Sequence, residues 1–253
     1  MLAVIGGTGL SDLESFKHIS EEGIKTIYAE TEVQVRRLVF EGCEFLFIPR
    51  HGHSHSIPPL LINYRANISA LAQLDVKNIV AVNAVGGIHG NLGPGSFAIP
   101  NQIIDYSHGR EGTYSVGGGE DVNHIDFTYP YDENLRQILL TAANQANKKS
   151  KTQHQIMDGG VYACTQGPRL ETAAEITRLE RDGCDMVGMT GMPEAALARE
   201  LGIAYGSLAL SVNWAAGLSE ELITMTEIQL VLEEGMGFVS QLLENVITSI
   251  GNK

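Results

Sequence analysis

The feature that most constrains this chain is a pair of apolar strands, each of which ends in residues that can bind an anion. The first strand, Leu2–Ile5, runs into a glycine turn at residues 6–9 (GGTG) that carries one hydroxyl. The second strand, Glu44–Pro49, ends in the segment RHGHSH at residues 50–55. Glycine lets backbone N–H groups approach an anion closely, and arginine presents a planar fork of donors that matches phosphate oxygens. The pairing predicts a phosphate held between the two strand ends.

Apolar runs of strand length recur along the chain, and helical patterns separate several of them. The expected strands are Leu2–Ile5, Glu44–Pro49, Asn78–Val85, Ser96–Ile104, Gln155–Thr165, Asp185–Met189 and Ala204–Val212. The expected helices are an apolar stripe from Leu135 to Ala146, a segment from a capping box at Thr172 and Glu175 to Gly183, the segment Pro193–Leu201, and a last helix from about Thr226 to Ile250 after a capping pair at Thr224 and Glu227. This alternation predicts an α/β fold, a single-domain sandwich over residues 1–253 around a parallel or mixed sheet.

Charge and cysteine content argue against several classes of protein. The chain carries 17 basic and 30 acidic residues, a formal net charge of −13, which disfavours a general nucleic-acid or membrane-surface binder. Its three cysteines, Cys43, Cys164 and Cys184, are an odd number without CxxC spacing, so neither a disulfide framework nor a structural zinc site is expected. The first strand begins next to Met1 and charges interrupt the apolar runs, so we expect no signal peptide, no membrane span and a cytoplasmic protein.

Two other interpretations of the strand-end motifs compete with phosphate binding. A dinucleotide-binding turn would need a third glycine, but Asp12 stands three residues after Gly9, where its carboxylate would face a pyrophosphate. A metal site could form from His51, His53 and His55, which alternate and so share one face of an extended segment. No acidic residue stands nearby in the sequence to complete a zinc or iron shell, so this site is the weaker hypothesis.

Polar groups and glycines also follow four later strands. They are Asn83 with a glycine pair at 86–87, the segment GPRLET at 167–172, the segment GMT at 188–190, and Asn213 within SVNWA at 211–215. The carboxyl ends of strands are where open α/β sheets bind ligands. Each motif alone is equally consistent with a structural role: a turn, a first-turn Glu171 that stabilises its helix, or a buried amide with backbone partners.

Taken in order, these segments resemble the trimeric purine nucleoside phosphorylase and methylthioadenosine phosphorylase family. The resemblance rests on GGTGL at 6–10, RHGHSH at 50–55, INYRANI at 62–68, NAVGG at 83–87, GPRLETAAE at 167–175 and VGMTGMPE at 187–194. These motifs span nearly the whole chain in the family's order and spacing. The resemblance implies a nucleoside phosphorylase fold, with an α/β sandwich around a mixed, partly barrel-like sheet.

The resemblance also implies phosphorolysis, in which phosphate displaces a purine from C1′ of a nucleoside through an oxocarbenium-like transition state. It assigns phosphate to Thr8, Arg50, His51, Asn83, Ala84 (through its backbone N–H) and Thr190, and the base to Leu170, Glu171, Gly188, Asn213 and Ala215. Met189 would lie under the ribose, and His51 and Asn213 would be the catalytic residues. His124 would reach the site of a neighbouring subunit in a homotrimer or a dimer of trimers. No metal or organic cofactor is implied, and inorganic phosphate is a co-substrate.

The base-binding positions differ from those of the methylthioadenosine branch, which places two aspartates where this chain has Asn213 and Ala215 and lacks a glutamate at the position of Glu171. A 6-oxopurine presents an N1–H donor and an O6 acceptor. Glu171 can accept from N1–H, and the Asn213 amide can donate to O6 or toward N7. Adenine presents the opposite edge and would leave buried groups unpaired, at a cost of about 1–3 kcal/mol each. The predicted base is hypoxanthine or guanine.

The sugar-binding positions suggest an apolar substituent. Ordinary purine nucleoside phosphorylases place a histidine for the 5′-hydroxyl where this chain aligns Met225. Ile223, Met225 and Ile228, with His124 from the neighbouring subunit, would form a pocket suited to a methylthio group. A 6-oxopurine on such a sugar is S-methyl-5′-thioinosine, so we predict a purine-salvage pentosyltransferase that cleaves it with phosphate to hypoxanthine and 5-methylthioribose 1-phosphate.

Four alternatives stay open at this point. The chain could be an inosine or guanosine phosphorylase, or a methylthioadenosine phosphorylase with a relaxed base site. It could be a non-catalytic protein that binds a nucleoside or phosphate, although the presence of Arg50, His51, Thr190 and Asn213 disfavours that reading. A metal hydrolase built on the three histidines is the last alternative.

Overall fold

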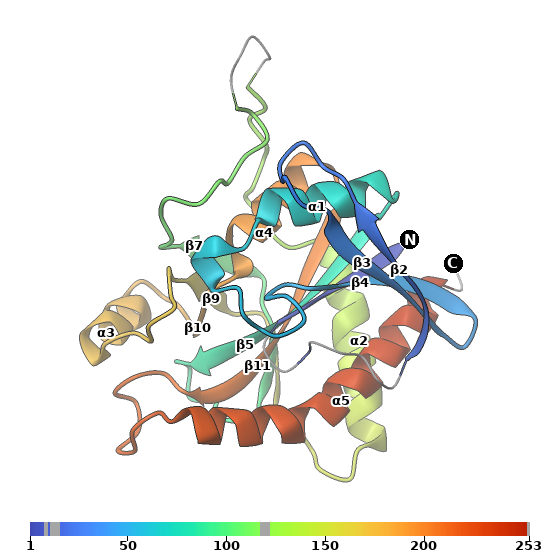
Figure 1. Ribbon diagram of the computed structural model, residues 1–253. Helices are drawn as coiled ribbons and strands as arrows, with labels where there is room; N and C mark the ends of the chain where they lie inside the picture. The colour runs from blue at the N-terminus through green and yellow to red at the C-terminus, as the bar shows by residue number, and fades with distance from the viewer. Residues whose placement is uncertain (8–9, 11–15, 117–121, 252–253) are drawn as a thin grey trace.

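The structure is a computed structural model (Figure 1), which describes residues 1–7, 10, 16–116 and 122–251. Its strands are β1 (Leu2–Gly6), β2 (Lys17–Ile24), β3 (Val33–Phe40), β4 (Cys43–Pro49), β5 (Asn78–Gly87), β6 (Phe97–Ile99), β7 (Gln102–Asp105), β8 (Ile156–Asp158), β9 (Val161–Cys164), β10 (Met186–Gly188) and β11 (Ala204–Trp214). Its helices are α1 (Tyr64–Gln73), α2 (Glu133–Lys149), α3 (Ala173–Arg181), α4 (Gly191–Glu200) and α5 (Met225–Gly251), with a short 3₁₀ helix at Pro59–Leu61.

These strands form one mixed sheet. One path through it runs β2-β3-β4-β1-β5-β10-β9-β7, and β11 pairs with β5 off this path, followed by β6 and β8. β1 lies parallel to both β4 and β5, and β11 lies parallel to β5. Because β1, β4, β5 and β11 share one direction, their carboxyl ends meet at the same edge of the sheet.

Strand β5 creates an opening in the sheet. β11 pairs with it from Asn78 to Gly87 along one edge. Along the other edge, β1 pairs with residues 78–81 and β10 pairs with residues 86–87. Residues 82–85 therefore lie between the end of one pairing and the start of the next. This interval carries Asn83 and Ala84, two of the residues that the family resemblance assigns to phosphate.

Helices cover both faces of the sheet (Figure 1). Strand β1 sends alternate side chains to opposite faces: Val4 packs in a cluster with residues of α2 and α5, and Ile5 packs in a cluster with residues of α1 and α4. Both side chains are fully buried, which explains why this strand is a continuous apolar run in the sequence. The central strands are thus packed from both sides, so the residues at their carboxyl ends extend from a well-packed base.

The predicted α/β fold with a large mixed sheet is confirmed. The predicted strands at β1, β4, β5, β10 and β11 and the predicted helices at α2, α3, α4 and α5 lie within a few residues of their observed bounds. Thr172 and Glu175 form the expected capping box of α3, and Thr224 and Glu227 exchange hydrogen bonds at the start of α5.

Two predicted strands were wrong in extent. The segment 96–104 contains β6 and β7, which Pro100 and Asn101 separate, because proline cannot donate to a ladder. The segment 155–165 contains β8 and β9, separated by Gly159 and Gly160 at φ +94° and +100°, a backbone conformation that turns the chain. In both cases the apolar character continues through a turn, so hydropathy alone does not reveal the break.

The sequence patterns did not predict the β2–β3 hairpin or helix α1. β2 has the polar sequence KHISEEGI and is exposed along almost its whole length, so no alternating apolar face marks it. Helix α1 begins at a cap in which the Asn63 side chain accepts from the N–H of Ala66 at 2.9 Å, and it buries Ile68 and Leu71.

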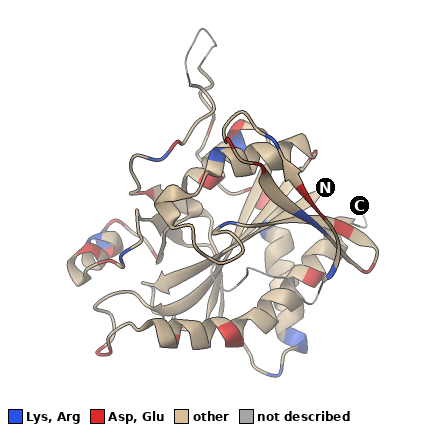
Figure 2. Cartoon of the chain, viewed as in Figure 1, with Lys and Arg blue, Asp and Glu red and all other residues tan. Residues whose placement is uncertain are grey.

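Charged residues of both signs lie on α3, on the β2–β3 hairpin and at separate positions along other helices (Figure 2). Among the described residues, the buried charged side chains are Arg50, Arg136 and Glu194. Burial of a charge is costly unless it is paired, so these positions mark where the fold has a specific requirement. No helix in the described part of the chain has the length and apolar composition that a bilayer span needs.

Candidate active site

A cavity of about 350 Å³ lies at the carboxyl ends of β1, β4, β5 and β11. Most of the predicted site residues line it: Arg50, His51, Asn83, Ala84, Leu170, Glu171, Gly188, Met189, Thr190, Asn213, Ala215, Ile223, Met225 and Ile228. Thr8 lies outside the described residues. The fold therefore brings together residues that are far apart in the sequence, and the cavity that they line has a buried polar end and a more exposed apolar end.

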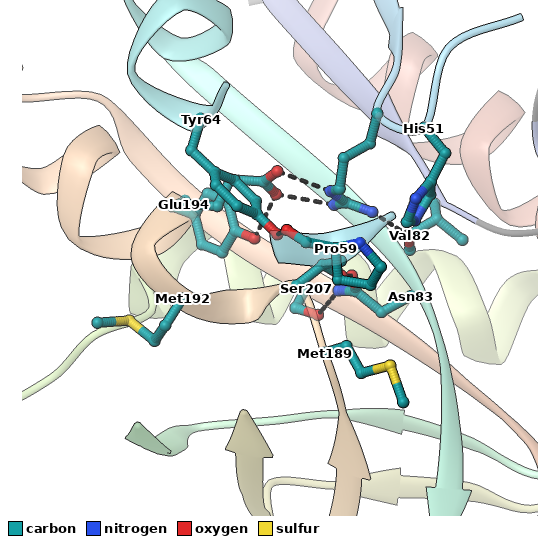
Figure 3. Close-up of polar contacts among 12 residues, drawn as sticks. His51, Pro59, Tyr64, Val82, Asn83, Met189, Met192, Glu194 and Ser207 are labelled. Carbon is teal, nitrogen blue, oxygen red and sulfur yellow. Dashed lines mark hydrogen bonds and ion pairs between the residues drawn. The ribbon is translucent and has the colours of Figure 1, made fainter. Parts of the chain in front are cut away.

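The polar end is organised around a buried ion pair between Arg50 and Glu194 (Figure 3). Arg50 follows β4, and its Nε and Nη2 donate to the two carboxylate oxygens of Glu194 on α4 at 2.7 and 2.8 Å. Tyr205 of β11 donates to the same carboxylate at 2.8 Å. Burial by itself would lower the pKa of Arg50, but the charge and hydrogen bonds of Glu194 outweigh burial and raise that pKa. The guanidinium is therefore a permanent cation held in one orientation.

The remaining nitrogen of this guanidinium points toward the opening in the sheet. Nη1 of Arg50 donates to the carbonyl of Val82 at 3.3 Å. A Cβ on Gly7 would lie 2.6 Å from that carbonyl oxygen and 3.1 Å from Nη1, so only glycine allows the chain after β1 to approach this closely. The two strand-end motifs are thus adjacent in space. Phosphate binding between them stays a prediction.

The Asn83 side chain links two hydroxyl groups at the polar end of the cavity. Its Nδ2 donates to the hydroxyl of Ser207 at 2.8 Å, and its Oδ1 accepts from the hydroxyl of Thr190 at 3.0 Å (Figure 3). All three side chains are buried. The amide therefore fixes the Thr190 hydroxyl at the end of β10, beside the cavity. A hydroxyl can rotate to donate to an anion when one is present. That Thr190 binds phosphate, as the family resemblance implies, stays a prediction.

His51 lies beside Arg50 as a neutral imidazole. Its Nδ1 is 2.8 Å from the carbonyl oxygen of Ile57, which can only accept, so the proton is on Nδ1 and Nε2 carries a lone pair. Burial lowers the pKa of His51 to about 4, the hydrogen bond to Ile57 opposes this, and Arg50 and His55 add to the lowering. At neutral pH the positive charge of the polar end is therefore that of Arg50.

The middle of the cavity carries two groups that can recognise a heterocycle. The carboxylate of Glu171 accepts from the hydroxyl of Thr165 at 2.7 Å through Oε1, which leaves Oε2 without that contact. Asn213 at the end of β11 donates one N–H to the carbonyl of Trp214 at 2.6 Å, which leaves its second N–H and its Oδ1 for a ligand. The carboxylate of Glu171 and the amide of Asn213 therefore line the middle of the cavity, together with apolar residues that include Val187 and Ala216.

The apolar end lies at the start of helix α5. Ile223, Met225 and Ile228 line the cavity there, together with Val212. Ile228 is buried, whereas Met225 is 69% exposed in this single chain. These side chains form an apolar wall that is open on the side of Met225. That this wall holds a methylthio group stays a prediction.

His124 does not line this cavity. It is an exposed residue of the segment between β7 and α2, which projects from the body of the molecule (Figure 1). The three histidines considered for a metal site also diverge. His53 lies 3.1 Å from Glu21 of the β2–β3 hairpin, while the rings of His51 and His55 lie 4.4 Å apart. In the described part of the chain, no group of three or more His, Cys, Asp or Glu residues is arranged to hold a metal ion.

Two residues that shape the site were not singled out from the sequence. Glu194 lies within the quoted segment VGMTGMPE, and its only signal is a carboxylate among small and apolar residues. Thr165 ends an apolar run, and threonine is common in strands, so its position did not indicate a role in the site. Their roles depend on partners at a distance, because Glu194 is 144 positions from Arg50 in the sequence.

Comparison with known proteins places this geometry in a family. The family model described as the phosphorylase superfamily matches residues 1–248. A protein of Pseudomonas syringae pv. tomato named probable S-methyl-5′-thioinosine phosphorylase is 51% identical over 247 residues, which are 98% of each chain. A protein of Moorella thermoacetica named probable 6-oxopurine nucleoside phosphorylase is 39% identical over 98% of this chain and 93% of its own. The methylthioadenosine phosphorylase of Schistosoma mansoni, solved in complex with adenine, superposes with a TM-score of 0.92 at 30% identity, over 100% of this chain and 92% of its own.

Proposed function

The chain belongs to the phosphorylase superfamily, and from that premise we propose that it cleaves S-methyl-5′-thioinosine with phosphate, giving hypoxanthine and 5-methylthioribose 1-phosphate. One observation supports this function above others. A single cavity combines a buried cation at Arg50, a carboxylate and an amide at Glu171 and Asn213, and an apolar wall at Ile223 and Met225. These groups match, in order, the phosphate, the 6-oxopurine and the methylthio sugar of the substrates.

In the proposed reaction a phosphate oxygen forms the new bond to C1′, and the bond from C1′ to the purine breaks with its electron pair on the base. The base then takes up the proton that hydrogen phosphate gives up on forming the ester, which yields neutral hypoxanthine. Arg50 holds the phosphate as a charge-assisted partner, with Thr190 beside it. Negative charge develops on the purine as it leaves. The N–H of Asn213 that is not donated to Trp214 stabilises that charge at N7 or O6, where a hydrogen bond strengthens as the bond breaks.

The preference for a 6-oxopurine follows from the acceptor at Glu171. Its carboxylate accepts from N1–H of hypoxanthine, whereas N1 of adenine has no hydrogen to donate. An adenine in the same position would place a lone pair against the carboxylate and leave two polar groups unpaired. A loss of this kind is worth about 1–3 kcal/mol for each buried group. The name of the Pseudomonas relative agrees with this base.

A second candidate function is that of a general 6-oxopurine nucleoside phosphorylase. Met225 is 69% exposed, so the apolar end is not closed by this chain alone and could admit a 5′-hydroxyl sugar. The Moorella relative carries a name of this kind at 39% identity. The remaining parts of the proposal are a homotrimer in which His124 of one subunit covers the apolar end of the next, one domain over residues 1–253, and a cytoplasmic location.

The test is a substrate panel measured with and without phosphate. Purified protein is incubated with S-methyl-5′-thioinosine, inosine or methylthioadenosine, and the released base is identified by chromatography. We expect hypoxanthine only when phosphate is present, with the methylthio substrate cleaved fastest. Base release without phosphate would indicate a hydrolase, equal rates with inosine would favour the second candidate, and faster release of adenine would overturn the role of Glu171. Absence of any release would indicate a binding protein.

A further inference from the structure

Arg110 forms the most extensive set of side-chain hydrogen bonds to backbone in the neighbourhood of the site. Its Nη1 donates to the carbonyls of Met189 and Met192 at 2.8 and 2.6 Å. Its Nη2 donates to the carbonyls of Thr165 and Gln166 at 3.1 and 2.8 Å. The two terminal nitrogens of a guanidinium carry four N–H groups, and each can be matched here to one carbonyl.

These four carbonyls belong to two chain segments, of which one contacts the cavity-lining Glu171 and the other contains the cavity-lining Met189 and Thr190. Thr165 and Gln166 follow β9, and the Thr165 hydroxyl donates to the carboxylate of Glu171 on the base side. Met189 follows β10 and precedes Thr190, so it belongs to the side assigned to ribose and phosphate. Strands β9 and β10 pair with each other only up to Cys164 and Gly188. Beyond that point one backbone hydrogen bond, from the Thr165 N–H to the Gly188 carbonyl at 2.8 Å, still links the two segments, and Arg110 joins them where they leave the sheet.

Arg110 reaches this position from outside the cavity. It lies in the segment after β7 and is not among the cavity-lining residues. Its guanidinium carbon lies 5.6 Å from the ring centre of Tyr64, whose hydroxyl is 3.4 Å from Nη1. Within the described residues, its buried Nε has no hydrogen-bond partner. The hydrogen bonds of the two terminal nitrogens therefore hold the Arg110 side chain in place, and they do so outside the lining of the cavity.

We propose that Arg110 is a positioning residue that sets the spacing between the base-binding and the ribose–phosphate walls of the cavity. The proposal rests on the proposed function for the identity of the two walls. A planar fork with four donors can satisfy carbonyls from two chain segments at once, whereas the three tetrahedral donors of a lysine cannot. Reaction at C1′ requires the base and the phosphate to be held in line, and small displacements between them reduce the rate steeply.

The experiment compares Arg110→Lys and Arg110→Ala with the matched control Arg181→Lys, an exposed arginine near the end of α3. We expect the control to retain the activity of the unmodified protein. We expect Arg110→Lys to lose at least tenfold in kcat/KM for S-methyl-5′-thioinosine, mainly through kcat, although it keeps the positive charge. A loss within twofold for Arg110→Lys would overturn the proposal, because the charge alone would then be sufficient.

Rescue by free guanidinium separates positioning from general damage to the fold. Arg110→Ala is assayed with added guanidinium chloride and, in parallel, with equal concentrations of methylammonium and sodium chloride. We expect guanidinium to raise the kcat of Arg110→Ala at least fivefold and methylammonium to leave that kcat unchanged, because only the planar ion reproduces the four contacts. No difference between the two ions would contradict the proposal. If Arg110→Ala does not fold, Arg110→Gln takes its place, because its amide still provides two donors.

A binding measurement keeps this test independent of the proposed reaction. Binding of hypoxanthine is measured by isothermal titration calorimetry, which requires no turnover. Hypoxanthine is titrated with and without saturating phosphate. We expect phosphate to tighten hypoxanthine binding in the unmodified protein and to lose this effect in Arg110→Lys. Persistence of the same coupling in Arg110→Lys would overturn the role of Arg110. Failure of the unmodified protein to bind hypoxanthine would instead contradict the proposed function.

Discussion

The two ends of the cavity are built in opposite ways. At the phosphate end, Arg50, Glu194 and Asn83 are each at most 2% exposed, and their side chains are hydrogen-bonded to one another or to adjacent strands. At the apolar end, which is proposed to bind the sugar, Ile228 is buried but Met225 is 69% exposed, and Met225 lies where a loop enters helix α5. The first end is made of strand termini packed from both sides and of Glu194 from helix α4. The second is made of a loop and the first turn of a helix.

This difference fits what each end is proposed to bind. Phosphate is a small anion of fixed shape, and a rigid arrangement of donors binds it without reorganisation. The nucleoside varies between related enzymes in its base and in its 5′ substituent, and loops change more readily than buried strands. The nucleoside end can therefore be altered without disturbing the phosphate end. Substitutions at the two ends should accordingly have different consequences, mainly stability at one and mainly selectivity at the other.

The largest expected effect is on stability at the phosphate end. Glu194→Gln removes the carboxylate that pairs with Arg50, and it leaves a buried cation without compensation. Breaking a buried pair from one side costs about 3–5 kcal/mol, so we expect the free energy of unfolding to fall by about that amount. Urea unfolding followed by far-UV circular dichroism measures this change. A loss below about 1 kcal/mol would show that the pair is not the structural centre of this end.

Two controls sharpen this result. The double variant Arg50→Met with Glu194→Leu removes both charges, and we expect it to unfold at a higher urea concentration than Glu194→Gln. Met225→Ala changes an exposed side chain at the other end of the cavity, and we expect the free energy of unfolding to change by no more than about 0.5 kcal/mol. Equal losses for Glu194→Gln and Met225→Ala would remove the contrast between the two ends.

The second effect is on the use of phosphate. Arg50→Met deletes the cation that Glu194 orients toward the opening between β1 and β10, so phosphate loses a charge-assisted partner worth about 1.5–3 kcal/mol. We expect the KM for phosphate to rise at least tenfold while the KM for S-methyl-5′-thioinosine changes less. Initial rates over a grid of both substrates measure the two constants. An unchanged phosphate KM would contradict the placement of the anion beside Arg50.

The third effect is a decrease in the free energy of unfolding at acidic pH, which is caused by protonation of His51 in the unfolded chain. Burial lowers the pKa of this imidazole to about 4, whereas the same group in the unfolded chain has a pKa of about 6.5. Between these values the unfolded state binds more protons, so stability falls as the pH falls below 6.5. The contribution of His51 is expected to reach about 2 kcal/mol at pH 5. Urea unfolding of His51→Gln and of the unmodified protein at pH 7.5 and pH 5 measures it.

His51→Gln keeps an N–H that can donate to the carbonyl of Ile57 but has no group that titrates in this range. We therefore expect the difference in stability between the two proteins to shift in favour of the variant as the pH falls from 7.5 to 5. If the difference is the same at both values, the imidazole takes up its proton without cost in the folded protein, and the neutral ring inferred from the Ile57 contact is wrong.

The contrast between the ends also explains what could be predicted from the sequence. The glycine turn, Arg50 and Asn213 follow apolar strands, and parallel strands bring their carboxyl ends together, so residue type and position were sufficient to gather them. Glu194 was not predicted as the partner of Arg50, because its burial follows from how α4 packs across β11 and no local pattern encodes that packing. Arg110 was missed for the same reason, since its four acceptors are backbone carbonyls and have no sequence signature.

The smallest expected effect tests selectivity at the sugar end. Met225→His introduces a polar group where the chain presents an apolar one, and it offers a partner to a 5′-hydroxyl. Because Met225 is 69% exposed in the single chain, water already competes for that hydroxyl. The gain for inosine is therefore limited to about 0.5–1 kcal/mol, equivalent to about two- to fivefold in the ratio of kcat/KM values for inosine and S-methyl-5′-thioinosine.

Leu230→His is the matched control for this prediction, because Leu230 lies on the same helix, is exposed and does not line the cavity. We expect it to leave the ratio unchanged. A shift well above tenfold in Met225→His would mean that the sugar end is more enclosed than one chain makes it, as would follow if His124 of a neighbouring subunit covered it. No shift at all would mean that the 5′ substituent does not reach Met225. We expect neither Met225→His nor Leu230→His to change the free energy of unfolding, because this end of the cavity contributes selectivity while the buried pair of Arg50 and Glu194 contributes stability.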